Sequence, residues 1–191
     1  MFLRILAALP LLFALPEFRI NWKDSRHDAL NVSISGYNET VERCIESGLE
    51  VRYRYELQLC RRRTLWFHAC KERNVVLQSL QFDPISEMYK VTRDRLGDDR
   101  GAVRTSAGTF EEGLAAASNV SDLPLGFLSG GDQAFVSDPR LYVSARVLAT
   151  CRGEYNETLA RIGYFLTLGL VKVSAFNTGR IDFNLDGEGR K

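Results

Sequence analysis

Residues 49–61 read LEVRYRYELQLCR and give the strongest local signal in this chain of 191 residues. Apolar and polar positions alternate along it without interruption. The apolar positions are Leu49, Val51, Tyr53, Tyr55, Leu57 and Leu59. Successive side chains of a strand point to opposite faces of a sheet, so a period of two predicts a strand with one buried face. The length of the pattern and its Val and Tyr content favour a half-buried antiparallel strand.

The segments on either side of this strand extend it into a sheet. Residues 30–35 alternate in the same way and predict an earlier strand, and residues 38–48 predict a short helix that ends at Gly48. After the polar break at residues 61–63, residues 65–82 resume an extended pattern. This arrangement predicts a long β-hairpin with an arginine-rich tip.

The middle of the chain is expected to contain a return strand, a loop and a helix. Asp83-Pro84 predicts a turn, after which residues 88–92 form the return strand. Residues 97–108 are charged and contain glycine, which favours a loop. Thr109-Phe110-Glu111-Glu112 has the pattern of a capping box, in which the Thr109 hydroxyl accepts from the Glu112 amide, and it predicts a helix to about Ser118.

The last third of the chain is expected to add one strand and one helix. Leu123-Pro124-Leu125-Gly126 should end any helix, and residues 140–150 alternate as another strand. A last helix is expected from residue 154 or 156 through Val171. Residues 186–191 are polar and are expected to form a flexible tail.

These expectations define an α+β fold. It consists of an antiparallel β-sheet with a long hairpin and two or three helices packed on one face. Hydrophobic residues make up 45% of the chain and charged residues 26%, which is typical of a globular protein. The length favours a single α+β domain over residues 20–185.

Residues 1–16 are expected to be a signal peptide or an N-terminal hydrophobic segment. Arg4 precedes about 11 to 14 apolar residues, which is enough for a signal peptide and too short for a membrane span. The alternative is a buried N-terminal helix in a cytosolic protein. We expect export to the periplasm, with association with the inner membrane as a further expectation. If the segment is not cleaved, it would act as a weak membrane anchor.

Cysteines and glycosylation motifs leave alternatives open. The four cysteines, Cys44, Cys60, Cys70 and Cys151, fit either disulfides of an oxidising compartment or buried free thiols, and the sequence does not rank the three pairings. Four Asn-x-Ser/Thr motifs begin at Asn31, Asn38, Asn119 and Asn156. These would be glycan sites only in a secreted eukaryotic chain.

The sequence contains no readable catalytic or metal-binding motif. His27 and His68 are the only histidines. His68 and Cys70 share a strand face, but residues two apart on a strand are roughly 7 Å apart, which is too far for a direct hydrogen bond. Residues 184–189 lack the oxygen spacing of a calcium loop. We therefore expect no catalytic residue, no cofactor and no metal, and the net charge of +1 argues against a nucleic-acid partner.

The arginine-rich tip has two interpretations. Arg61, Arg62 and Arg63, together with Trp66, could contact lipid phosphates or an acidic partner. The other interpretation is a solvated hairpin end that discourages pairing between sheet edges. These four residues are the candidate surface-binding site.

Six segments, in this order along the chain, resemble a known family. They are Glu46-Ser47-Gly48-Leu49, Arg61-Arg62-Arg63, Leu65-Trp66-Phe67, Tyr89-Lys90-Val91, Thr109-Phe110-Glu111-Glu112 and Leu141-Tyr142-Val143. They are similar to those of a bacterial family of exported proteins named as domain-of-unknown-function family 4390. The resemblance implies a bacterial, exported protein without an assigned activity, has no catalytic residues to carry over, and implies that the Asn-x-Ser/Thr motifs are accidental.

These observations favour a non-catalytic extracytoplasmic binding or accessory module that contacts a membrane surface or a membrane protein. Two alternatives remain, a carrier that holds an apolar ligand between sheet and helices and an enzyme without a recognisable motif. A deep apolar pocket would favour the carrier, and converging polar groups with shifted pKa values would favour the enzyme.

Overall fold

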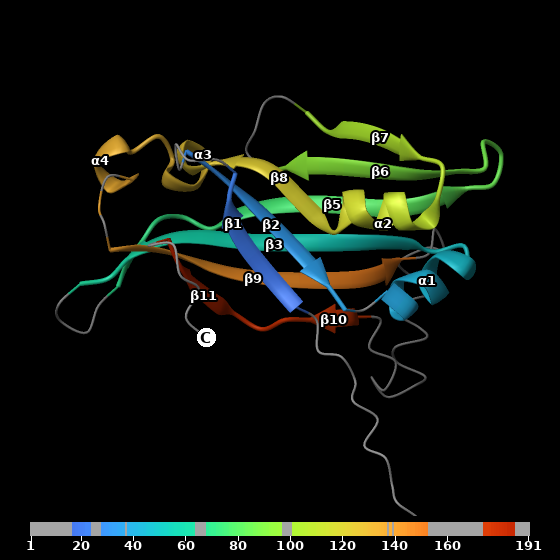
Figure 1. Cartoon of the computed structure of the whole chain (residues 1–191), viewed down its shortest axis with the longest axis horizontal. Coiled ribbons are helices and arrows are strands. Elements are labelled where there is room, and N and C mark those ends of the chain that lie inside the picture. The colour runs from blue at the N-terminus through green and yellow to red at the C-terminus, as the bar shows by residue number, and fades with distance from the viewer. Residues whose placement is uncertain are drawn as a thin grey trace, which may run out of the picture.

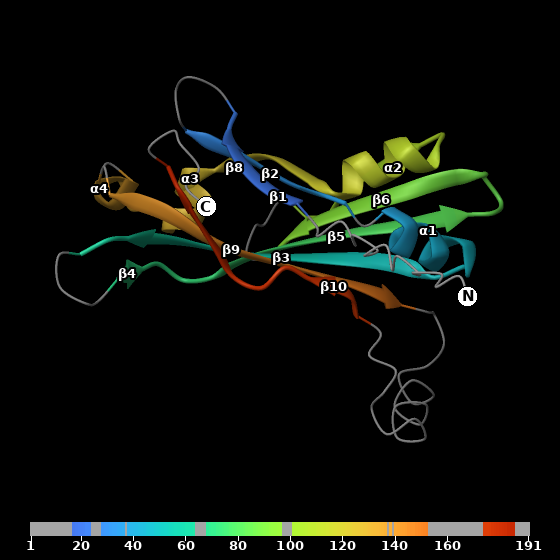
Figure 2. The same ribbon diagram turned by 60° about the horizontal axis from the view of Figure 1, so that its bottom comes forward.

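The structure is a computed structural model that describes residues 17–23, 28–36, 38–63, 68–96, 101–136, 138, 140–152 and 174–185. Two antiparallel sheets of unequal size lie one over the other (Figures 1 and 2). The mostly antiparallel α+β fold predicted from the sequence is confirmed.

The larger sheet is built around β3 (Glu50–Arg61), which pairs with β9 (Leu141–Arg152) on one side and β5 (Asn74–Asp83) on the other. Its strand order is β10-β9-β3-β5-β6-β7, with β11 also paired to β9 and β4 to β3. The remaining strands are β4 (Ala69–Cys70), β6 (Met88–Arg95), β7 (Val103–Ala107), β10 (Ser174–Asn177) and β11 (Ile181–Asn184). The long predicted hairpin is therefore formed by β3 with β4 and β5.

The smaller sheet covers one face of the larger one. It contains β1 (Glu17–Trp22), β2 (Ala29–Ser35) and β8 (Asn119–Pro124), in the order β1-β2-β8. The helices α1 (Asn38–Glu46) and α2 (Phe110–Ala117) lie on the same face (Figure 2). Two short helices, α3 (Leu125–Ser129) and α4 (Gln133–Val136), lie towards the hairpin tip (Figure 1).

The alternation of residues 49–61 determines which face of the large sheet is buried. Val51, Tyr53, Tyr55, Leu57 and Leu59 are fully buried between the two layers. The opposite face of β3 is charged, and Glu56 there accepts from Arg54 at 2.9 Å and from Arg73 at 3.3 Å. The predicted inward face of residues 140–150 is also buried, because Leu141, Val143, Ala145, Val147 and Ala149 are each at most 5% exposed.

The predicted helix boundaries are confirmed at α1 and α2. Gly48 follows α1 with a φ of +72°, a conformation that glycine adopts without steric cost. The Thr109 hydroxyl accepts from the Glu112 amide at 3.2 Å, while the Glu112 carboxylate accepts from the Gly108 amide at 3.2 Å. The second bond reaches one residue further back than in the usual capping box.

The loop predicted over residues 97–108 is wrong in part, because β7 occupies Val103–Ala107. This strand is the outermost of the large sheet and is exposed along most of its length. An edge strand without a buried face has no apolar alternation, so its sequence lacks the pattern on which the other strands were predicted.

The prediction that residues 123–126 end a helix is also wrong. These residues are the junction between β8 and α3, and Pro124 is the residue before the first turn of α3. Proline has no amide hydrogen to donate, and such a donor is not needed at a helix start. The strands β1, β8, β10 and β11 were not predicted from the sequence, and neither was the division of the strands into two sheets.

Several predictions fall outside the described residues. They are the N-terminal segment 1–16, Trp66, the helix from residue 154 or 156 to Val171 and the tail 186–191. The four cysteines, in contrast, are described and form two disulfides, Cys44–Cys151 and Cys60–Cys70. The alternative of buried free thiols is therefore wrong. Within the described ranges, no helix is long and apolar enough to cross a membrane.

Candidate functional site

Three of the four predicted surface residues lie together where the β3–β4 hairpin ends. Arg61 is the last residue of β3 and pairs with Ala69, while Arg62 and Arg63 follow it into the connection. The neighbouring rung of the hairpin is Cys60 opposite Cys70, whose disulfide joins the two strands. The backbone that carries the arginines is therefore covalently fixed at its base.

Arg61 makes structural contacts at this end of the molecule. Its Nη1 donates to the Asp138 carboxylate at 3.3 Å, and its guanidinium carbon lies 5.4 Å from the centre of the Phe135 ring. Its Nε is buried and has no hydrogen-bond partner. The side chain connects the end of β3 to α4, so its contribution to binding a partner would be indirect.

Arg62 and Arg63 are more available to a partner. Arg62 donates through Nη2 to the side-chain oxygen of Asn184 at 2.7 Å and lies 5.6 Å from the centre of the Tyr142 ring. Neither of these groups carries a negative charge. Arg63 is exposed and makes no ion pair with any residue in the described part of the chain.

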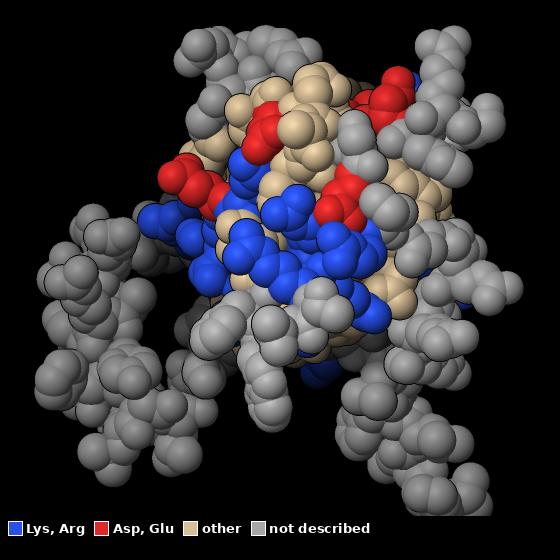
Figure 3. Space-filling view, turned by 90° about the vertical axis from the view of Figure 1, so that its left-hand side faces the viewer, with Lys and Arg blue, Asp and Glu red and all other residues tan. Residues whose placement is uncertain are grey.

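Three further cations gather around this tip and define a basic end that comprises Arg61, Arg62, Arg63, Lys71, Arg73 and Arg140. Figure 3 shows blue side chains clustered on this end of the molecule, with red side chains between and around them. Lys71 pairs with Asp132 at 2.6 Å, and Arg140 pairs with Asp138 at 3.4 Å. Sequence reasoning missed Arg140, because only the pairing of β3 with β9 brings it to the tip. It also missed Lys71 and Arg73, because residues 65–82 were interpreted as one extended segment, whereas these two residues lie in the connection between β4 and β5.

The carboxylates at the basic end stay ionised and offset part of its charge. A hydrogen bond from Lys71, followed by one from the Phe135 amide, holds the pKa of Asp132 below its usual value. The pKa of Asp138 is also lowered, first by the hydrogen bond from the Arg140 amide. The positive charges of Arg62 and Arg63 face no carboxylate among the ion pairs of the described residues, so they are the charges that an anionic surface would meet first.

The His68–Cys70 pair considered from the sequence does not form a nucleophile. Cys70 is bonded to Cys60, and a disulfide sulfur carries no thiol to deprotonate. The His68 ring instead lies edge-on to Tyr142, with centroids 5.5 Å apart. In the part of the chain that the structure describes, no three His, Cys, Asp or Glu side chains are grouped so that they could hold a metal ion.

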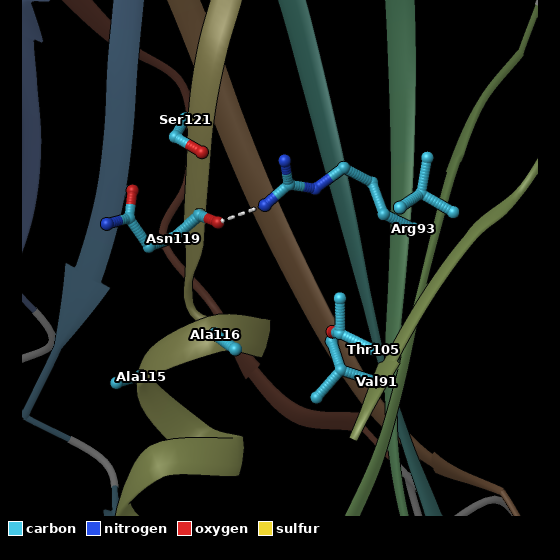
Figure 4. A pocket seen from close by; sticks show the side chains of 8 residues that line it. Val91, Arg93, Thr105, Ala115, Ala116, Asn119 and Ser121 are labelled. Carbon is cyan, nitrogen blue, oxygen red and sulfur yellow. Dashed lines mark hydrogen bonds between the residues drawn. The ribbon is translucent and has the colours of Figure 1, made fainter. Parts of the chain in front are cut away.

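A second candidate site is a cavity of about 330 Å³ between the two layers, bounded by α2 and β8 on one side and by β6 and β7 on the other (Figure 4). Its lining residues are Val91, Arg93, Val103, Thr105, Ala115, Ala116, Asn119 and Ser121. Half of these are polar, so the cavity differs from the deep apolar pocket that an apolar carrier would need. No sequence motif marked it, since its residues come from four separate elements.

Comparison with known proteins gives one match. The family model described as Domain of unknown function (DUF4390) matches residues 24–146, which confirms the resemblance seen in the sequence. No curated protein and no solved structure matches the chain. The matched region contains both the basic end and the cavity.

Proposed function

We propose that this chain, which belongs to the DUF4390 family, is a non-catalytic binding module outside the cytoplasm that attaches to an anionic membrane surface through its basic end. The proposal rests on one observation, the gathering of six cations at one end of a chain whose net charge is only +1. Asp132, Asp138 and Glu56 pair with Lys71, Arg61, Arg140 and Arg73, whereas Arg62 and Arg63 make no ion pair among the described residues.

The electrostatics of this end suit a membrane surface better than a compact ligand. Each cation near an anionic bilayer contributes about 1 kcal/mol, and the attraction fades within a Debye length of about 8 Å at physiological salt. A hairpin end places several cations within that distance at once. The Cys60–Cys70 disulfide fixes the base of the hairpin, which lowers the backbone entropy that is lost when Arg62 and Arg63 meet the headgroups.

Two features support a location outside the cytoplasm. Residues 1–16 have the pattern of an export signal. The pairing of all four cysteines as disulfides is typical of proteins from oxidising compartments. A fusion of residues 1–24 to a reporter that is active only outside the cytoplasm should therefore give signal, and a well-expressed but silent fusion would contradict the location.

The membrane proposal is tested by co-sedimentation with lipid vesicles. The parent protein should bind vesicles that contain phosphatidylglycerol, bind phosphatidylcholine vesicles weakly, and lose binding as salt rises. The double variant Arg62→Ser/Arg63→Ser should bind roughly 30-fold more weakly, as expected for about 2 kcal/mol. Arg61 is left in place because it anchors α4 through Asp138 and Phe135.

The matched control is Arg43→Ser/Arg104→Ser, which removes the same charge from α1 and β7, away from the basic end. This control should bind anionic vesicles like the parent. Equal losses in both double variants would mean that only net charge matters. A parent that ignores anionic vesicles would contradict the proposal and would favour an acidic protein as the partner.

A further inference from the structure

We propose that the cavity between α2, β8, β6 and β7, which we name the Arg93 cavity, binds a small carboxylate with a short apolar tail. Figure 4 shows the Arg93 side chain reaching from β6 across the cavity to the backbone of β8. Its Nη2 donates to the carbonyl oxygen of Asn119 at 2.8 Å. This inference does not depend on the basic end.

The charge of Arg93 is incompletely satisfied. The side chain is half-buried, its Nε is buried without a hydrogen-bond partner, and it makes no ion pair with a carboxylate of the described residues. The nearby Asp122 is already paired with Lys23 at 2.5 Å. Buried charges in proteins are usually paired, so a guanidinium whose partner is only a carbonyl group is a ready contact for an anion.

The surroundings of Arg93 also favour an anion. Burial, followed by the positive charge of Arg95, lowers the pKa of Arg93. An arginine stays protonated regardless, so this lowering reflects a cation that its surroundings stabilise poorly. A carboxylate in the cavity would add a negative charge directly beside the Arg93 guanidinium, which makes no ion pair among the described residues.

The cavity has one polar region and one apolar region. The Ser121 hydroxyl lies on β8 near the guanidinium and points towards the same space (Figure 4). Val91 and Ala116 form the walls further from the guanidinium. A guanidinium beside a hydroxyl suits a carboxylate, because both groups donate to its oxygens, while the alanine and valine walls suit a short hydrocarbon chain.

The volume limits the size of the ligand. At roughly 30 Å³ for each water molecule, a cavity of 330 Å³ has room for about ten waters or a ligand of about ten non-hydrogen atoms. A medium-chain fatty acid such as octanoate has this size. The hydrogen bonds from Gln78 to Ala116 and Asn119, at 3.4 and 3.2 Å, hold the α2–β8 wall against the large sheet, so the cavity is formed before the ligand enters.

The test is titration calorimetry with sodium octanoate at constant ionic strength, with octanol as the uncharged analogue of the same length. We expect saturable binding of octanoate and at least tenfold weaker binding of octanol. Arg93→Met keeps the stem of the side chain and removes its charge, and it should weaken octanoate binding at least tenfold. Arg104→Met, on the opposite face of the adjacent strand β7, should change it less than twofold.

A second variant keeps the test decisive if Arg93→Met does not fold. Ala116→Leu places a larger side chain in the cavity from α2 and leaves the guanidinium in place, and it should also weaken octanoate binding at least tenfold. The proposal is overturned if the parent shows no saturable binding of octanoate. It is equally overturned if octanol binds as tightly as octanoate, or if both cavity variants bind like the parent.

Discussion

The Tyr55 hydroxyl donates a hydrogen bond of 3.2 Å to the carbonyl oxygen of Ala117, the last residue of α2. Tyr55 lies in the middle of β3 and is fully buried, so this bond fixes the end of the helix over the central strand of the large sheet. Burial, followed by the neighbouring Tyr53, raises the pKa of the Tyr55 phenol well above its usual value. The phenol therefore stays protonated and remains a donor at any physiological pH.

The first prediction concerns this bond. Tyr55→Phe removes the donor and leaves the Ala117 carbonyl oxygen without it in the core, so the free energy of unfolding should fall by about 1–3 kcal/mol. Urea denaturation followed by circular dichroism measures the change. Tyr89→Phe is the control, because Tyr89 is only partly buried and its contacts with Phe82 and Phe110 are made by the ring. Equal losses in the two variants would show that the bond to Ala117 contributes nothing.

The second prediction concerns the close approach of α2 to the large sheet. A Cβ atom at Gly113 would lie 2.9 Å from the Cβ of Tyr89 and 3.0 Å from a methyl group of Leu80. Gly113→Ala should therefore destabilise the protein by about 1–3 kcal/mol, although alanine favours helix. Gly126→Ala in α3 meets nothing within 4 Å and should be close to neutral. Thermal unfolding of the two variants would contradict this packing if Gly113→Ala were the more stable.

The third prediction compares the two disulfides. Cys44–Cys151 spans 107 residues and links α1 to the end of β9, whereas Cys60–Cys70 spans 10. A longer closed loop restricts the unfolded chain more, so the chain-entropy model gives about 2 kcal/mol more stabilisation for the first disulfide. In urea denaturation, Cys44→Ala/Cys151→Ala should lose more stability than Cys60→Ala/Cys70→Ala. The reverse order would mean that local packing at the hairpin outweighs loop closure.

How much of the fold the sequence predicts depends on whether a segment has one buried face. In β3 and β9 every second residue from Val51 to Leu59 and from Leu141 to Ala149 is buried, and both strands were predicted from this period of two. The edge strand β7 has polar or exposed residues on both faces, and β8 contains Asp122 with a φ of +57°. Neither has a regular period, so tertiary pairing rather than local pattern makes them strands.

The candidate sites also differ in whether a local sequence pattern or only the folded structure reveals them. Arg61, Arg62 and Arg63 are consecutive, so the sequence alone shows that they form a cluster of positive charge. Arg93 and Asn119 are 26 residues apart and lie on different sheets, and only the stacking of the two layers brings them to 2.8 Å. The pairing of Arg61 with Asp138, across 77 residues, likewise depends on the fold. Because of this contact, Arg61 stabilises the end of β3 and contributes only indirectly to binding.

The fourth prediction concerns acid stability at the β5–β6 turn. The hydrogen bond from Lys90, followed by those from Ser86 and the Ile85 amide, lowers the pKa of Asp83 well below its usual value. A carboxyl whose pKa is lower in the folded state stabilises the protein above its unfolded pKa of about 3.9, and this contribution disappears as the pH falls through the folded value.

Asp83→Asn should therefore be less stable than the parent at neutral pH, and the difference should shrink as the pH falls below about 4. Urea denaturation at a series of pH values measures the difference, and Glu87→Gln, a neighbouring exposed position in the same turn, is the control. A constant difference from neutral to strongly acidic pH would show that the Asp83 charge does not contribute.

The last prediction asks which part of the molecule touches the membrane. An environment-sensitive dye is attached through Glu72→Cys, between Lys71 and Arg73 at the basic end, or through Glu39→Cys on α1 at the opposite end (Figure 1). Both positions are exposed glutamates, so the two substitutions change the charge equally. On addition of phosphatidylglycerol vesicles, we expect a blue shift at residue 72 that high salt reverses, and no shift at residue 39. A shift at residue 39 alone, equal shifts at both positions, or none at either would contradict attachment through the basic end.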